Sequence, residues 1–146
     1  MQDDRLTSSL PHAVVRLFRL VNRAHNRALG PVGVSAEQAH VLSILWEIGP
    51  VTVGELQRLL ALSSPTLTGA IDRMEAQRLV QRVRSPRDRR VQVLEPDLRA
   101  HRWRRKIWAI LDRTERECFA GLTKAERREL LRLLDKATAA LDRDEK

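Results

Sequence analysis

The hydrophobic residues of this chain recur at helical spacing in every segment except one. Between Pro11 and Leu29, apolar side chains follow one another at three- and four-residue steps with arginines between them, which predicts an amphipathic helix. Similar patterns begin near residues 36, 53, 64, 98 and 124. The sequence therefore predicts six helices, with Gly30-Pro31 and Gly49-Pro50 ending the first two.

Capping boxes mark three of the helix starts. In each box a Ser or Thr is followed three residues later by Glu or Gln, so each side chain can bond the backbone N–H of the other residue. The three pairs are Ser35–Gln38, Thr52–Glu55 and Thr123–Glu126. Asp97 is the expected N-cap of the fifth helix. On the short third helix, Leu56 and Leu59 are expected to face inward.

In the one segment without helical spacing, apolar residues recur with a period near two. Leu79–Val83 and Val91–Leu94 alternate as strands do, and a polar connector that contains Pro86 joins them. This pattern predicts a β-hairpin with an arginine-rich tip. The complete order of elements predicts a mainly α fold with a small β-hairpin wing.

Composition narrows the class of protein. The chain has 146 residues, which suits a single domain, and only one cysteine, which excludes a disulfide scaffold. No apolar run approaches the ~20 residues that span a bilayer. The first residues lack the basic start and apolar stretch of a signal peptide. We therefore expect a cytoplasmic protein without membrane contact.

Positive charge is concentrated on the predicted hairpin. The chain carries 27 Lys and Arg against 19 Asp and Glu, a formal net charge of +8. Six arginines, namely Arg78, Arg82, Arg84, Arg87, Arg89 and Arg90, lie in the hairpin region with one acid, Asp88. Arginine at such a tip can enter a DNA minor groove. Asp88 is expected to pair with Arg90 or a neighbour and so fix the shape of the hairpin.

The two short helices before the hairpin are joined by a tight Ala-Leu-Ser turn, as in a helix-turn-helix. The second of them is the size of helix that fits a major groove. Its first turn offers the hydroxyl groups of Ser63, Ser64, Thr66 and Thr68, and Gly69 stands where a long arginine could be expected. The segment therefore predicts contact with double-stranded DNA.

These residues resemble the MarR family of winged helix-turn-helix transcriptional regulators, from about Ser35 to Leu141. The matching stretches are Val53–Leu56, Leu62–Thr68, Ile71–Glu75, Leu79–Arg82 and Asp88–Arg90, followed by Thr123–Leu134. The resemblance implies a single domain in which residues 35–96 form the DNA-binding lobe. Residues 10–30 and 97–142 would then be dimerisation helices. It also implies a homodimeric repressor on a pseudo-palindromic operator.

The residues expected to contact DNA lie on the fourth helix and on the hairpin. They are Ser63, Ser64, Pro65, Thr66, Thr68, Arg73, Arg84, Arg87, Arg89 and Arg90. Asp72 and Arg73 match a family helix signature that is more often structural than base-reading. Arg78 departs from the family, whose members usually carry glycine there, so an altered helix C-terminus is expected.

The resemblance also implies release from DNA by a small aromatic or anionic effector. The candidate pocket residues are His12, Arg16, His40 and Trp46, because a cation or imidazole beside an aromatic ring can hold an anionic ring. Three of the four have a plainer interpretation. Trp46 suits the core, His40 suits a satisfied, partly buried site, and Arg16 suits a solvated or dimer-bridging position.

Other functional classes find less support in the sequence. No HExxH motif, glycine-rich phosphate loop or nucleophile elbow occurs, so we expect no catalytic residues, metal site or cofactor. A winged-helix adaptor that binds protein would not need the excess charge on the hairpin. Redox sensing would require a reactive Cys118, whose acidic neighbours disfavour the thiolate. Trp103 and Trp108 are expected to pack where the lobe meets the dimerisation helices.

Overall fold

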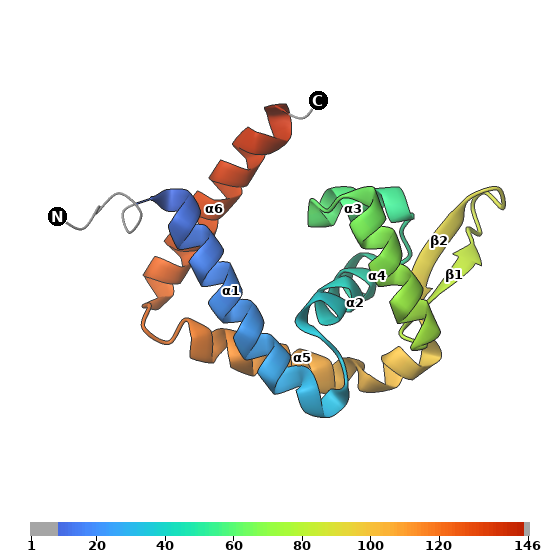
Figure 1. Cartoon of the computed structure of the whole chain (residues 1–146), viewed down its shortest axis with the longest axis horizontal. Helices are drawn as coiled ribbons and strands as arrows, with labels where there is room; N and C mark the ends of the chain where they lie inside the picture. The colour runs from blue at the N-terminus through green and yellow to red at the C-terminus, as the bar shows by residue number, and fades with distance from the viewer. Residues whose placement is uncertain (1–8, 145–146) are drawn as a thin grey trace.

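The structure, a computed structural model that describes residues 9–144, is mainly α-helical with one two-stranded antiparallel hairpin (Figure 1). Its elements in chain order are α1 (Leu10–Leu29), the 3-10 helix η1 (Gly30–Val32), α2 (Ala36–Ile48), α3 (Val53–Leu60), α4 (Ser64–Ala76), β1 (Val80–Arg84), β2 (Gln92–Pro96), α5 (Leu98–Cys118) and α6 (Lys124–Asp144). The predicted fold class and order of elements are confirmed.

The chain forms a packed lobe and a helical arm. The lobe, from α2 to β2, is built around side chains that are fully buried, among them Leu42, Leu56, Leu67 and Ile71. The arm consists of α1, α5 and α6, and α6 stands away from the lobe (Figure 1). The expectation that Leu59 faces inward is wrong, since 56% of its surface is exposed. The short α3 packs mainly against α4 and buries Leu56 alone.

All three predicted capping boxes form. In α3, the Thr52 backbone N–H donates to Oε2 of Glu55 at 2.7 Å, and the Glu55 N–H donates to Oγ1 of Thr52 at 3.1 Å. The bond from the Thr52 backbone N–H, together with a second bond from the Thr52 hydroxyl to Oε2 at 2.9 Å, lowers the pKa of Glu55, because both favour the charged carboxylate. The same reciprocal pair joins Thr123 and Glu126 at the start of α6. Each box satisfies backbone donors that the first helical turn leaves free.

The hairpin is anchored to the lobe through a third backbone segment. Val80 pairs with Pro96 and Arg84 with Gln92. Strand β1 begins and ends one residue later than predicted, whereas β2 begins one residue later and ends two residues later. Val51, in the loop between α2 and α3, exchanges two backbone hydrogen bonds with Leu94 at 2.7 and 3.2 Å. Periodicity within the hairpin alone could not reveal this contact, because Val51 is distant in the sequence.

The long helix α5 joins the other helices of the arm to the lobe. Ile107 is fully buried, and Trp103 and Trp108 pack against the core where the two parts meet, as predicted. The ring centroids of Trp108 and Trp46 lie 6.4 Å apart, within the range of favourable aromatic pairs. Within residues 9–144, no helix combines the length and apolar character that crossing a membrane requires.

Arg78 closes α4 in the left-handed conformation, with φ of 57°. Its N–H donates to the Glu75 carbonyl at 3.0 Å, and the Leu79 N–H donates to the Met74 carbonyl at 2.9 Å. Such closures usually place glycine at the left-handed position, because a Cβ atom there costs roughly 1–2 kcal/mol. The expectation of an altered helix end is therefore wrong for the hydrogen bonds, which are those of an ordinary closure, and the departure is confined to a strained residue at the left-handed position.

We expect Arg78→Gly to raise the free energy of unfolding by about 0.5–1 kcal/mol. Relief of the left-handed strain outweighs the extra chain entropy that glycine adds to the unfolded state. Urea denaturation measures the change. Arg78→Ala is the matched control, since it removes the exposed guanidinium but keeps the Cβ atom, and its stability should stay near that of the parent. If both variants gained the same free energy of unfolding, the effect would come from removing the charge and not from relieving the strain.

Candidate nucleic-acid interface

Helix α4 buries one face and presents the other to solvent. Leu67, Ile71 and Met74 are at most 1% exposed and fix the inward face. The predicted contact residues of this segment are all exposed: Ser63, Ser64, Pro65, Thr66, Thr68 and Arg73. This helix thus displays short hydroxyl groups and the long cation of Arg73 on a surface that no other element within residues 9–144 covers.

The start of α4 differs from the starts of α2 and α3. Ser63 occupies the N-cap position but makes no side-chain bond to the helix backbone. Its hydroxyl lies 2.8 Å from the hydroxyl of Thr66 instead. The first N–H groups of α4 are therefore without the side-chain partners that capping boxes supply to the other two helices. Free N–H groups at a helix start favour an anion such as phosphate.

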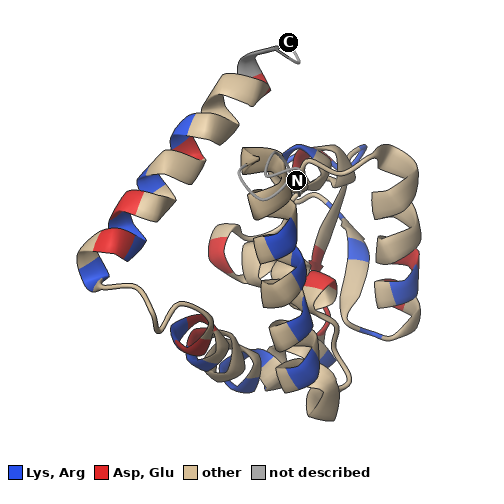
Figure 2. Ribbon diagram, turned by 60° about the vertical axis from the view of Figure 1, so that its left-hand side comes forward, with Lys and Arg blue, Asp and Glu red and all other residues tan. Residues whose placement is uncertain are grey.

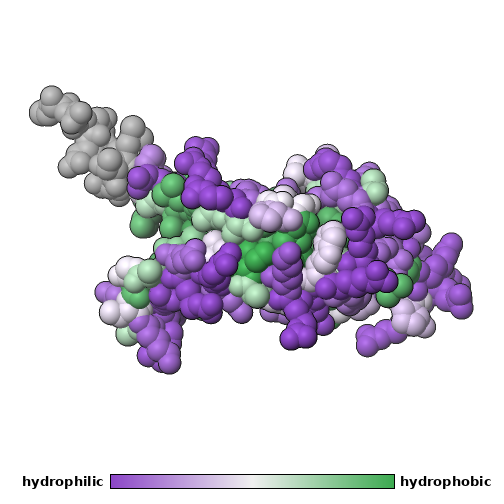
Figure 3. All heavy atoms as spheres, turned by 90° about the horizontal axis from the view of Figure 1, so that it is seen from below, coloured by the Kyte–Doolittle hydropathy of each residue, from purple (hydrophilic) through white to green (hydrophobic). Residues whose placement is uncertain are grey.

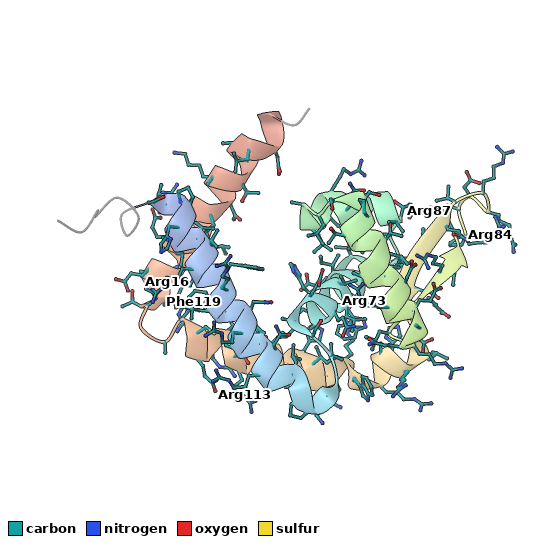
Figure 4. The ribbon with its side chains drawn as sticks, viewed as in Figure 1. Arg16, Arg73, Arg84, Arg87, Arg113 and Phe119 are labelled. Atoms are coloured by element: carbon teal, nitrogen blue, oxygen red, sulfur yellow. The ribbon has the colours of Figure 1, made fainter. Side chains whose placement is uncertain are left out.

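The hairpin tip is held in shape by its own backbone. Asp88 contacts Arg90 as predicted, but its carboxylate accepts from the Arg90 backbone N–H at 2.9 Å and not from the guanidinium. Arg84, another predicted DNA contact, donates from Nη1 to the Arg89 carbonyl at 2.8 Å, so one of its guanidinium nitrogens is already bonded within the tip. Figure 4 labels Arg84 and Arg87 on the hairpin, which projects from the lobe.

Three guanidinium groups at the tip remain available. Arg87, Arg89 and Arg90 are exposed, and within residues 9–144 their side chains have no hydrogen bond or ion pair. Basic residues also lie along α1 and α5, away from the hairpin (Figure 2). Within residues 9–144, Arg16 on α1 and Arg105 on α5 are likewise exposed and without an ion pair, so what distinguishes the tip is that its cations project from the lobe.

Arg82 is not one of the available guanidinium groups of the hairpin. Its Nη2 donates to Asp72 at 2.7 Å, and its Nη1 donates to Glu75, both on α4. The bond to Asp72 is the main cause that raises the pKa of Arg82, with the charge of Glu75 adding to it. We name Arg82, Asp72 and Glu75 the α4–β1 clamp. Arg82 is one of the six arginines counted in the hairpin region but not one of the predicted DNA contacts, and the clamp neutralises its charge.

Arg73 and Gly69 form a second arrangement that periodicity did not reveal. A methyl group placed on Gly69 would lie 3.4 Å from Nη1 of Arg73. The guanidinium therefore covers the glycine one helical turn before it. The only sequence signal was the unexpected glycine on a helix whose other outward residues carry side chains.

The four predicted effector residues lie in two places. His12 and Arg16 line one depression on α1, together with Ala13, Leu17 and Leu20. His40 and Trp46 lie on α2, where His40 is exposed and Trp46 is buried against Trp108. Desolvation lowers the pKa of His40, which favours its neutral form. The burial of Trp46 agrees with its interpretation as a core residue.

Cys118 lies at the end of α5 and is half-buried. It borders a cavity of about 300 Å³ with Ala24, Arg27, Ala28, Thr114 and Glu117. Among residues 9–144, no three His, Cys, Asp or Glu side chains gather in a way that could hold a metal ion.

The lobe has the architecture of a winged helix-turn-helix: α3 and α4 joined by a tight turn, then the hairpin. Known proteins place this architecture in a family. The model of the MarR family matches residues 34–91. The regulator MgrA of Staphylococcus aureus is 30% identical over 138 residues, which cover 94% of this chain and 92% of MgrA. This chain therefore belongs to the MarR family of transcriptional regulators.

Other relatives match over a shorter stretch or in fold alone. The regulator YsmB of Bacillus subtilis is 36% identical over 72 residues, which is 49% of this chain and 49% of YsmB, so the match spans about half of either protein. A cysteine-to-serine mutant of MarR from E. coli, solved with operator DNA, has a TM-score of 0.82 at 22% identity, covering 94% of this chain and 99% of MarR. BpsR of Bordetella bronchiseptica has a TM-score of 0.81 at 21% identity, covering 92% and 96%.

We expect Arg82→Gln to lower the free energy of unfolding by about 1 kcal/mol, because it breaks two charge-assisted bonds at a half-buried position. Chemical denaturation measures the loss. Arg102→Gln, which removes an exposed cation elsewhere on the chain, is the control and should change stability much less. If Arg82→Gln and Arg102→Gln were equally stable, the clamp would have no energetic role.

Proposed function

We propose that this protein is a cytoplasmic, homodimeric repressor that binds a pseudo-palindromic operator. The observation that carries the proposal is the pairing of two exposed features on one lobe: the hydroxyl-bearing face of α4 and the unpaired arginines of the hairpin tip. A helix of this kind fits the major groove, and arginines on an adjoining hairpin fit the minor groove beside it.

In this proposal the ten predicted contact residues bind different parts of the DNA. The free N–H groups at the start of α4, with Ser63, Ser64, Pro65, Thr66 and Thr68 around them, contact phosphate and base edges. Arg73 supplies the long donor of this helix. Arg87, Arg89 and Arg90 enter or line the minor groove, and Arg84 contributes the donors that its bond to Arg89 leaves free. The mutant MarR structure with operator DNA supports this assignment by analogy of fold.

The apolar surface of the arm supports a dimer. Large hydrophobic side chains are exposed on α1 and α6, including Leu10 at 80%, Phe18 at 66%, Leu131 at 60% and Leu141 at 68%. Hydrophobic surface lies beside the start of α1 in the view from below (Figure 3). Surface of this kind on a chain of this size marks an interface. In a two-fold dimer the two α4 helices would lie about 34 Å apart, one turn of DNA.

Release by a small aromatic or anionic effector is the second part of the proposal. BpsR, which shares this fold, has its DNA binding regulated by 6-hydroxynicotinic acid according to its structural description. In this chain the depression on α1 places His12 and Arg16 beside Leu17 and Leu20. A carboxylate could pair with Arg16 while a ring rests on the leucines. His40 and Trp46 would then act on the effector only indirectly.

We expect Arg87→Ala to weaken binding to a selected duplex by about 1–3 kcal/mol. The duplex is obtained by selecting a randomised library on the wild-type protein, and a gel-shift titration gives the affinity. The wild-type affinity should also fall steeply as salt rises, because bound phosphates release counterions.

Arg105→Ala is the matched control for this experiment. It removes the same charge from an exposed position on α5, so the duplex affinity should change little. Equal affinities for the parent and Arg87→Ala would contradict the proposed role of the hairpin. Selection that returns no bound duplex would favour the protein-binding adaptor.

For the dimer, we expect Phe18→Glu to convert the protein into monomers of 16.8 kDa, because it places a charge on the apolar surface of α1. Sedimentation equilibrium measures the mass. Leu98→Glu is the control, since Leu98 is 76% exposed but lies at the lobe end of α5, and this variant should remain dimeric. A monomeric wild type, or dissociation of both variants, would rule out the assigned surface.

A further inference from the structure

The centre of the outward face of α4 has no side chain of its own. Gly69 lies two residues from both Leu67 and Ile71, which are fully buried, so it faces the opposite direction at 3.6 residues per turn. Its neighbours on this face, Pro65 and Thr68, are short. A helix that met a groove with these groups alone would have no long donor for base edges.

The guanidinium of Arg73 occupies the space that Gly69 leaves open. Helical side chains lean toward the N-terminus, which brings residue 73 over residue 69. A methyl group built on Gly69 would meet Nη1 of Arg73 at 3.4 Å, and among residues 9–144 this is the one atom within 4 Å apart from the neighbouring residues and the backbone of the helix itself. Figure 4 labels Arg73 on this helix. The cation therefore lies across the middle of the exposed face, closer to the start of the helix than its own Cα atom.

The α4–β1 clamp keeps this cation free. Asp72 is the acidic residue next to Arg73, and it is bound at 2.7 Å by Arg82. Glu75, two residues beyond Arg73, is bound by the same guanidinium. Within residues 9–144, Arg73 has no ion pair, and it is exposed. The nearest acids are thus directed toward the hairpin, and the donors of Arg73 remain unused.

We propose that Gly69 and Arg73 together form a reader of guanine in the major groove. The fork of a guanidinium matches the two acceptors, O6 and N7, that guanine displays there. Gly69 is the specificity-determining partner, because a larger residue would fill the space beside Nη1 of Arg73. This inference rests on the proposed binding to DNA and adds the base that α4 recognises.

The experiment uses the full-length protein and a duplex selected on it from a randomised library. Each guanine of the duplex is replaced in turn by 7-deazaguanine, which lacks the N7 acceptor. For the wild type we expect a loss of at least about fivefold at one guanine in each half-site, and little loss elsewhere. Arg73→Ala should abolish the difference between guanine and 7-deazaguanine at that position.

Two substitutions of the glycine separate its role from that of the arginine. Gly69→Leu should behave as Arg73→Ala does, because its side chain fills the guanidinium's place. Gly69→Ala is the matched control, since a methyl group at 3.4 Å from a flexible side-chain end fits, and the discrimination should survive. Thermal melts by circular dichroism show that each variant is folded, and both should be at least as stable as the parent.

Four results would overturn the inference. Arg73→Ala could weaken binding equally for all duplexes and reduce the salt slope by about one, which indicates a phosphate contact. Gly69→Leu could keep the discrimination against 7-deazaguanine, which removes the role of the glycine. A wild type that selects duplexes but tolerates 7-deazaguanine everywhere would refute guanine reading while leaving DNA binding intact, whereas a wild type that selects none refutes both.

Discussion

The attachment of the hairpin to α4 is the constraint on which the rest of the proposed interface depends. Arg82 on β1 binds Asp72 and Glu75 on α4, so side-chain ion pairs hold the helix and the hairpin together. Backbone pairing of Val51 with Leu94 anchors the same hairpin to the other side of the lobe. Because a groove-binding helix and a wing must meet neighbouring grooves at once, their relative position matters more than the affinity of either alone. The clamp also engages the acids that would otherwise neutralise Arg73.

Arginine serves several distinct purposes within one short stretch of this chain. Arg78 closes a helix in a left-handed conformation, and Arg82 neutralises two carboxylates. Arg84 braces the hairpin tip through a backbone carbonyl, whereas Arg87 is left unpaired. A count of charge cannot separate these uses, because the residue type is the same in each. The partners that separate them come from other elements or from the folded turn.

The apolar residues of the arm likewise differ in their surroundings although their type and spacing are alike. The periodicity of α1 and α6 correctly indicates that each helix has an apolar face, yet side chains such as Phe18 and Leu134 are exposed. Periodicity describes only which residues share a face and says nothing of what covers it. Leu59 in the lobe is a further case, since it lies at helical spacing from Leu56 but outside the contact that buries Leu56.

The sequence alone was sufficient for the order of elements, the three capping boxes, the hairpin and the exposed hydroxyl groups of α4. These features depend on interactions over a few residues, such as the bond from Glu55 back to Thr52, so local spacing predicts them. The tertiary structure decided which arginines are free, where the strands end, and how Gly69 and Arg73 fit together. Those outcomes depend on side-chain direction and on contacts between distant segments, as with Val51 and Leu94 or Arg82 and Asp72. A linear pattern does not contain that information, because burial and charge pairing are set by the packing of the whole lobe.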